Sequence, residues 1–163
     1  MINGRYFVLA LLAFASPVQA QKQALGIFSL WGSFRDGSRC WAVSEPEGAA
    51  RRSGGRAFAS VSWSMAGGPR GQLAIHFAAP RRAGSAVLLR VDDRLFQLAG
   101  SGADAWAADA RADAEIVAAM RTGVQMTVES RAETGGALRD TYALRGAATA
   151  IDAAAIGCAR RPR

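Results

Sequence analysis

Apolar and polar residues alternate with a period of two along much of this chain. The alternation indicates strands that bury one face and expose the other. The expected inward positions on three segments are Ala57, Ala59, Val61 and Trp63; Leu73, Ile75 and Phe77; and Val124, Met126 and Val128. Residues 85–91 and 94–98 form an apolar pair of segments, residues 138–144 continue the pattern, and residues 25–34 and 40–43 are expected to add two more strands. The pattern therefore predicts a mainly β protein.

Turn residues separate the expected strands. Asp92-Asp93 suits a tight hairpin turn, and Gly135-Gly136 marks another. Segments rich in glycine, serine and arginine are expected to be loops, at 48–55, 67–70 and 100–103. None of these segments is long enough to separate two domains.

Two segments break the alternation and favour helices. Residues 113–122 are rich in helix formers, with Asp113 as the expected N-cap and Gly123 as the end. Residues 147–159 are rich in alanine and predict a C-terminal helix. The expected architecture is an antiparallel β-sandwich with two short α-helices, in a single domain of residues 21–163.

The first twenty residues have the pattern of a secretory signal peptide. Arg5 supplies a positive start, Phe7–Ala15 is an apolar run, and Val18-Gln19-Ala20 matches the small-x-small cleavage pattern. The apolar run is far shorter than the roughly 20 residues that a membrane-spanning helix needs. Residues 1–20 are therefore expected to be cleaved, and no span is expected in the mature chain.

The chain contains two cysteines, Cys40 and Cys158. An even number of cysteines in an exported protein favours a disulfide. The bridge would staple the C-terminal helix to an early strand, whereas the alternative is two free or intermolecular thiols.

Candidate catalytic groups are few. The only histidine, His76, lies on the polar side of an expected strand, and no serine has the sequence context of a nucleophile. One histidine and two bridged cysteines cannot supply a zinc site, and the aspartates do not follow a calcium-loop spacing. No phosphate-binding glycine motif is present. We therefore expect no catalytic residue, no metal and no cofactor.

Arginine accounts for almost all of the positive charge, and the net charge is +7. A strongly basic chain suggests nucleic acid as a partner, but an exported protein encounters little nucleic acid. A protein or an envelope component is the expected partner. The candidate interaction surface consists of Arg51, Arg52, Arg56, Arg81 and Arg82, since arginine binds phosphate and carboxylate in a bidentate manner. A tail of Arg160, Arg161 and Arg163 adds charge, and four tryptophans are candidate interface anchors, of which most are expected in the core.

Four features of the mature chain are similar to the invasion-associated locus B family of Gram-negative bacteria. They are Phe28-x-x-Trp31 followed by Cys40, the segment 87–93, the segment 121–128, and the segment 144–151. The resemblance implies a periplasmic or cell-surface β-sandwich without catalytic residues. Relatives carry a further cysteine pair where this chain has Arg35-Asp36 and Asp104-Ala105-Trp106, so the sequence departs from the family there.

The expected function is that of an exported periplasmic protein, in some settings associated with the outer membrane, that binds a protein or an envelope component without catalysis. The alternative is a small periplasmic hydrolase or inhibitor-like module that acts on an anionic ligand. That alternative requires His76 to lie in a cleft beside a carboxylate or a serine hydroxyl.

Overall fold

A computed structural model describes residues 22–48, 55–68 and 70–159 of the chain. The expected signal peptide and the basic tail of Arg160, Arg161 and Arg163 lie outside these residues. The described part contains ten strands and two helices: β1 (Gln23–Phe28), β2 (Trp31–Asp36), β3 (Arg39–Ser44), β4 (Phe58–Ser64), β5 (Arg70–His76), β6 (Val87–Val91), β7 (Arg94–Ser101), β8 (Asp104–Trp106), α1 (Ala110–Thr122), β9 (Gln125–Arg131), β10 (Ala137–Ala143) and α2 (Ala147–Ala159).

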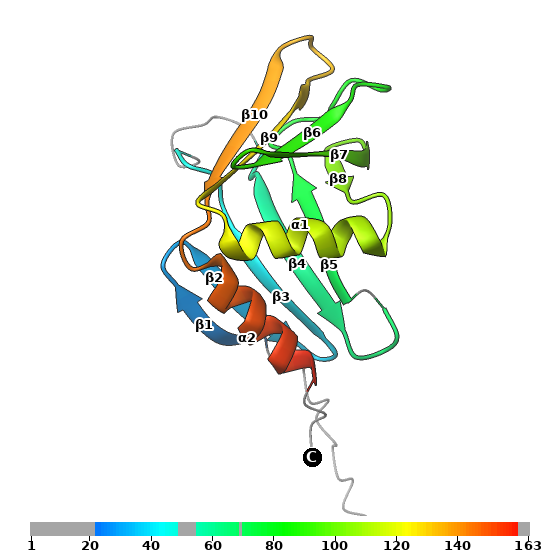
Figure 1. Cartoon of the computed structure of the whole chain (residues 1–163). Coiled ribbons are helices and arrows are strands. Elements are labelled where there is room, and N and C mark those ends of the chain that lie inside the picture. Colours follow the sequence, from blue (N-terminus) through cyan, green and yellow to red (C-terminus); the bar gives the residue numbers. More distant parts are fainter. Residues whose placement is uncertain (1–21, 49–54, 69, 160–163) are drawn as a thin grey trace, which may run out of the picture.

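All ten strands belong to one hydrogen-bonded order, β1-β2-β3-β4-β5-β8-β7-β6-β9-β10, and every neighbouring pair is antiparallel (Figure 1). Strand β7 joins the two halves, because its first part pairs with β6 and its last part with β8. The expectation of a mainly antiparallel β protein with two short helices is confirmed.

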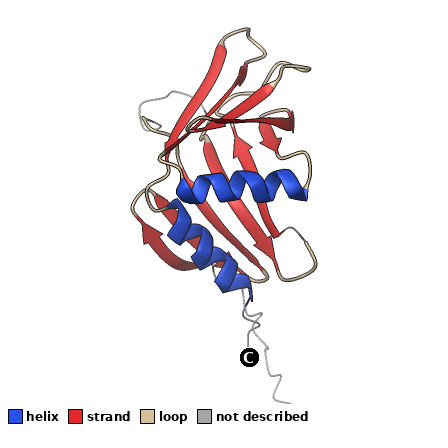
Figure 2. Ribbon diagram, viewed as in Figure 1, coloured by secondary structure: helices blue, strands red, loops and turns tan. Residues whose placement is uncertain are grey.

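Both helices lie over the same face of the first half of the sheet (Figure 2). Helix α2 packs mainly on β1, β2 and β3, and α1 packs on β5. One core cluster contains side chains from both helices and both halves of the sheet. Its largest fully buried members are Trp31, Leu73, Ile75, Phe77, Leu89, Ile116, Met120, Met126, Tyr142 and Ile151.

The period-two pattern identifies most inward positions correctly. Leu73, Ile75 and Phe77 are fully buried, and Met126 and Val128 of β9 are buried as well. Val124 breaks the series, since it lies before β9 and is 78% exposed. The hairpin at Asp92-Asp93 is confirmed, and the Asp92 carboxylate accepts hydrogen bonds from the backbone of Val124 at 3.1 Å and of Gln125 at 3.1 Å.

Two expectations about strands and loops were wrong, and one strand was missed. Residues 25–34 form two strands rather than one, because Ser29 adopts a φ of 58° and turns the chain between β1 and β2. Gly100 and Ser101 belong to β7 rather than to a loop, and they pair with β8, a strand of three residues that the pattern did not indicate. The turn before β2 escaped notice because it contains an apolar residue, Leu30. Strand β8 escaped notice because three residues are too few to show an alternation.

Helix α1 begins earlier than its composition predicts. The N-cap is Asp109, whose side chain accepts a hydrogen bond from the Ala112 amide at 2.8 Å, so the assignment of Asp113 as N-cap was wrong. Asp113 instead lies buried in the first turn and accepts a hydrogen bond from the Leu73 amide of β5 at 2.8 Å. On β5, strand β8 pairs with residues 74–76 and does not reach Leu73, so the Asp113 carboxylate binds the next amide along this edge of β5.

The C-terminal segment is attached to the first strands by covalent and polar contacts. The predicted disulfide joins Cys40 of β3 to Cys158 of α2, across a sequence separation of 118 residues. The Trp31 indole donates a hydrogen bond to the Ala143 carbonyl at 2.9 Å. Gly146, with a φ of 91°, lies so close to Phe28 that a Cβ would approach its carbonyl oxygen to 1.8 Å, so only glycine fits there.

Removal of the disulfide is expected to lower the free energy of unfolding by about 2–5 kcal/mol, because the bridge limits a long loop in the unfolded chain. Urea unfolding of the Cys40→Ala/Cys158→Ala variant measures this difference. Reductant should destabilise the wild type to the level of the variant and leave the variant unchanged. Equal stability of both proteins under oxidising conditions would contradict the expectation.

Burial raises the pKa of Asp113 above its ordinary value of 3.8, against the opposing effect of the Leu73 hydrogen bond and with a smaller contribution from Asp109. A raised pKa in the folded state means that the native protein binds this proton more tightly than the unfolded chain does. The stability that Asp113 contributes is therefore complete below pH 3.8 and is lost as the pH rises through its folded pKa.

An Asp113→Asn variant keeps a hydrogen-bond acceptor and carries no charge. Its advantage in unfolding free energy over the wild type is expected to increase as the pH rises from about 3 and then to level off. Asp113→Ala leaves the buried Leu73 amide unpaired and is expected to cost about 1–3 kcal/mol relative to Asp113→Asn. Urea unfolding from pH 3 to 8 tests both predictions. If the difference in unfolding free energy between the wild type and Asp113→Asn does not change with pH, the predicted pH dependence is refuted.

Candidate functional site

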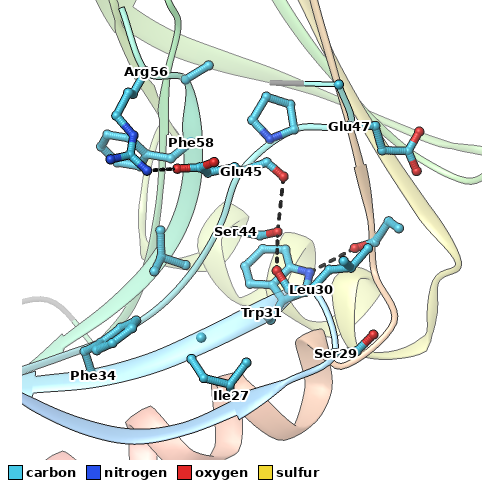
Figure 3. Close-up of a pocket in the computed structure, with 16 residues that line it drawn as sticks. Ile27, Ser29, Leu30, Trp31, Phe34, Ser44, Glu45, Glu47, Arg56 and Phe58 are labelled. Atoms are coloured by element: carbon cyan, nitrogen blue, oxygen red, sulfur yellow. Dashed lines mark hydrogen bonds and ion pairs between the residues drawn. The ribbon is translucent and has the colours of Figure 1, made fainter. Parts of the chain in front are cut away.

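A pocket of about 1020 Å³ lies between the β1–β2 turn, the start of β4 and the segment that follows β3 (Figure 3). Small-molecule sites usually occupy roughly 300–1,000 Å³, so this hollow is large for a protein of this length. Its walls come from parts of the chain that are distant in sequence, from Ile27 to Ala143.

The lining of the pocket is mainly apolar. Ile27 and Leu30 are 68% and 53% exposed, respectively, and both side chains border the hollow. Phe34, Val43 and Phe58 are half-buried. Figure 3 shows Phe58 above Phe34 and Ile27 in this view. These side chains lie on the face of the sheet opposite the helices, because Cys40, Ala42 and Ser44 of β3 are buried while Val43 is not.

Local backbone features shape the pocket. Gly32 lies beneath two lining side chains, and a Cβ there would lie 2.7 Å from the Phe34 ring and 3.2 Å from the Ile27 side chain. The Ser44 hydroxyl donates to the Leu30 carbonyl at 2.7 Å and attaches the turn to the end of β3. The Glu47 amide donates to the Thr141 carbonyl of β10 at 2.8 Å. The walls are therefore joined to one another by hydrogen bonds.

Charged groups occur only at the rim among the described lining residues. Arg56 and Glu45 form an ion pair, and both side chains are at least half exposed. Such exposed pairs contribute about 0–1 kcal/mol. Glu47 is exposed and supplies a second carboxylate. The rim thus carries two carboxylates and one guanidinium in a chain whose net charge is +7.

Three of the five arginines of the expected interaction surface lie within the described residues. Arg51 and Arg52 lie outside the described residues, Arg56 lines the pocket, and Arg82 is exposed. The assignment of Arg81 to a surface was wrong, because its residue is only 6% exposed.

Arg81 is buried because the backbone makes room for its guanidinium. Its Nη1 and Nη2 atoms donate weakly to the carbonyls of Ser85 at 3.3 Å and Asp104 at 3.5 Å. A Cβ at Gly100 would lie 2.6 Å from Nη2, so the glycine in β7 accommodates the arginine.

His76 lies beside a carboxylate, which is one of the two conditions of the catalytic alternative, but it lines none of the described pockets. Its Nδ1 atom is 2.7 Å from Oδ1 of Asp104, which extends from the neighbouring strand β8, and its ring stacks on Phe58 at 5.1 Å. A carboxylate at Nδ1 fixes the orientation and tautomer of an imidazole, so that its Nε2 atom can act as a general base. Among the described residues, no hydrogen bond joins this ring to a serine, threonine or cysteine.

The tryptophans fall into two groups. Trp31 is fully buried and Trp63 packs against the core. Trp41 is half-buried and stacks on Phe34 at 6.0 Å, and Trp106 is 37% exposed. Within the described ranges, no helix is long and apolar enough to cross a membrane, and no group of three or more acidic, histidine or cysteine side chains is arranged to hold a metal.

No family model, no curated protein and no solved structure matches the chain. The resemblance to the invasion-associated locus B family therefore stays a prediction. Of the lining residues, the sequence analysis had named Arg56 as part of a candidate interaction surface, but it did not identify the apolar lining. The available signal was the apolar character of Phe34 and Val43, which share strands with buried residues but lie on the other face.

Proposed function

We propose that this protein is an exported, non-catalytic binding domain of the cell envelope, of the invasion-associated locus B type, that receives an apolar group of a protein or envelope component. The observation that carries the proposal is the pocket of about 1020 Å³ with an apolar lining. Concave apolar sites with a few polar groups at the rim are typical binding sites.

The exposed side chains at the pocket favour a ligand. Ile27 and Leu30 are large apolar residues that remain in contact with water, and neither of the two described helices covers them. Covering apolar surface is favourable by roughly 25 cal/mol per Å². An occupant would therefore be stabilised by removing this surface from water, and exposed apolar surface of this kind commonly marks an interaction site.

The polar groups of the pocket favour binding over reaction. The Ser44 hydroxyl is used to hold the Leu30 carbonyl, and Arg56 is paired with Glu45. Export is supported by the disulfide between Cys40 and Cys158, since such bridges persist in oxidising compartments.

Leu30→Gln is expected to weaken binding of the neutral apolar dye Nile red at least about five-fold, because roughly 1 kcal/mol of apolar contact is lost. Leu95→Gln is the matched control, since Leu95 of β7 is 54% exposed and does not line the pocket. Fluorescence titration of the three proteins measures the affinities. An equal effect of the two substitutions would refute the pocket as the binding site.

The second candidate is a small periplasmic hydrolase or inhibitor-like module for an anionic ligand. The contact between His76 and Asp104 favours it, because an oriented imidazole is a common general base.

On the leading proposal, wild-type protein and His76→Ala are expected to hydrolyse p-nitrophenyl phosphate and p-nitrophenyl acetate no faster than buffer alone. Absorbance of released nitrophenol measures the rates. Turnover by the wild type that disappears in His76→Ala and falls in Asp104→Asn would instead establish the hydrolase, provided that both variants keep the wild-type melting temperature.

A further inference from the structure

Strand β1 is the first strand of the sheet, and its partner is β2. Within the described ranges, no segment pairs with its other edge. An edge strand presents a row of backbone N–H and C=O groups that can pair with another extended chain. Such a row distinguishes an extended polypeptide from a lipid or another ligand that lacks a peptide backbone.

The two edges of the sheet differ in the features that normally prevent pairing. Charged side chains and proline protect edge strands. Strand β10, at the opposite edge, contains Arg139 and Asp140, and its Thr141 carbonyl already accepts a hydrogen bond from Glu47. Strand β1 has the sequence QALGIF, with no charged residue and no proline. Its one protective feature is a bulge-like register shift between Ala24 and Gly26, so the regular part of this edge is residues 26–28.

The open edge of β1 is continuous with the pocket. Ile27 belongs to β1 and lines the pocket. Leu25 lies at the register shift between Ala24 and Gly26 and packs toward α2 instead, so that a Cβ at Gly157 would lie 2.6 Å from it. Successive side chains of a strand point to opposite faces. A strand added to β1 would therefore direct every second side chain to the face on which the pocket opens.

The rim gives the added strand a charge preference. Among the lining residues that the structure describes, Glu45 and Glu47 face one guanidinium, that of Arg56, in a chain that is otherwise strongly basic. A basic side chain next to the apolar ones complements this rim, and complementary charge favours the correct partner.

We propose that β1 binds an extended segment of a partner protein by strand addition, with apolar side chains entering the pocket and a basic side chain at the Glu45–Glu47 rim. This inference rests on the proposed function, because it names the partner class for the same pocket. Strand addition takes its affinity from main-chain hydrogen bonds and its specificity from pockets for alternate side chains.

The test uses the mature, disulfide-bonded protein and a fluorescein-labelled peptide, Thr-Val-Thr-Val-Thr-Lys, with blocked ends. Two further peptides are N-methylated, one on the threonines and the other on the valines and lysine. In an added strand only one of these two sets faces β1. One N-methylated peptide should therefore bind at least about tenfold more weakly than the unmodified peptide while the other retains binding, as measured by fluorescence polarisation. Because the ligand is altered, folding of the protein is not at issue.

Hydrogen exchange locates the bound peptide. Amides of Gln23–Phe28 should exchange more slowly when the peptide is bound, and replacing its lysine by glutamate should weaken binding. Equal binding of all three backbone forms, protection of β10 instead of β1, or binding that requires self-association of the protein would overturn strand addition.

The two proposals fail separately. If Leu30→Gln weakens Nile red binding but the peptide leaves β1 unprotected, the pocket stands and strand addition is refuted. If Leu30→Gln has no more effect on Nile red than Leu95→Gln, the proposed function itself is refuted.

Discussion

The attachment of the C-terminal segment to the first three strands is the constraint on which the rest of the structure depends. The Cys40–Cys158 bridge, the Trp31–Ala143 hydrogen bond and a hydrogen bond from Arg35 to the Gly157 carbonyl at 3.3 Å all join residues more than 100 positions apart. Closing loops of this length is costly in chain entropy. The disulfide keeps the two ends of the loop together in the unfolded chain as well. The hydrogen bonds between these ends therefore form at a smaller cost in chain entropy.

The pocket depends on the same attachment. Its walls include the β1–β2 turn, which contains Leu30, and Ala143 at the end of β10. The hydrogen bonds that hold these walls come from Trp31, Ser44 and Glu47. The hydrogen bond from Trp31 that attaches the C-terminal segment therefore also positions Ala143, one wall of the pocket.

The sequence predicts those features that depend on local alternation, and it fails where neighbours in space decide. Leu73, Ile75 and Phe77 alternate cleanly because β5 buries one face only. Strands β2 and β3 carry apolar residues on both faces, since Phe34 borders the pocket and Cys40 lies in the core, so the pattern could not reveal a binding face.

Charged residues show the same limit. Arg81 follows a proline in a polar segment and has the composition of a loop, yet Gly100 of a distant strand leaves room for it in the interior. Asp113 has the composition of a helix cap, but the short length of β8 leaves an amide of β5 for it to bind. Both placements depend on strand pairings that are non-local in the sequence.

The unequal edges of the sheet have a consequence for assembly. A sheet with two open edges can add copies of itself at both ends and grow into a fibre. Here β10 contains charged residues and its Thr141 carbonyl is already bonded to Glu47, which disfavours growth in that direction. A strand added at β1 would occupy the other edge, and the resulting complex would then have a defined size.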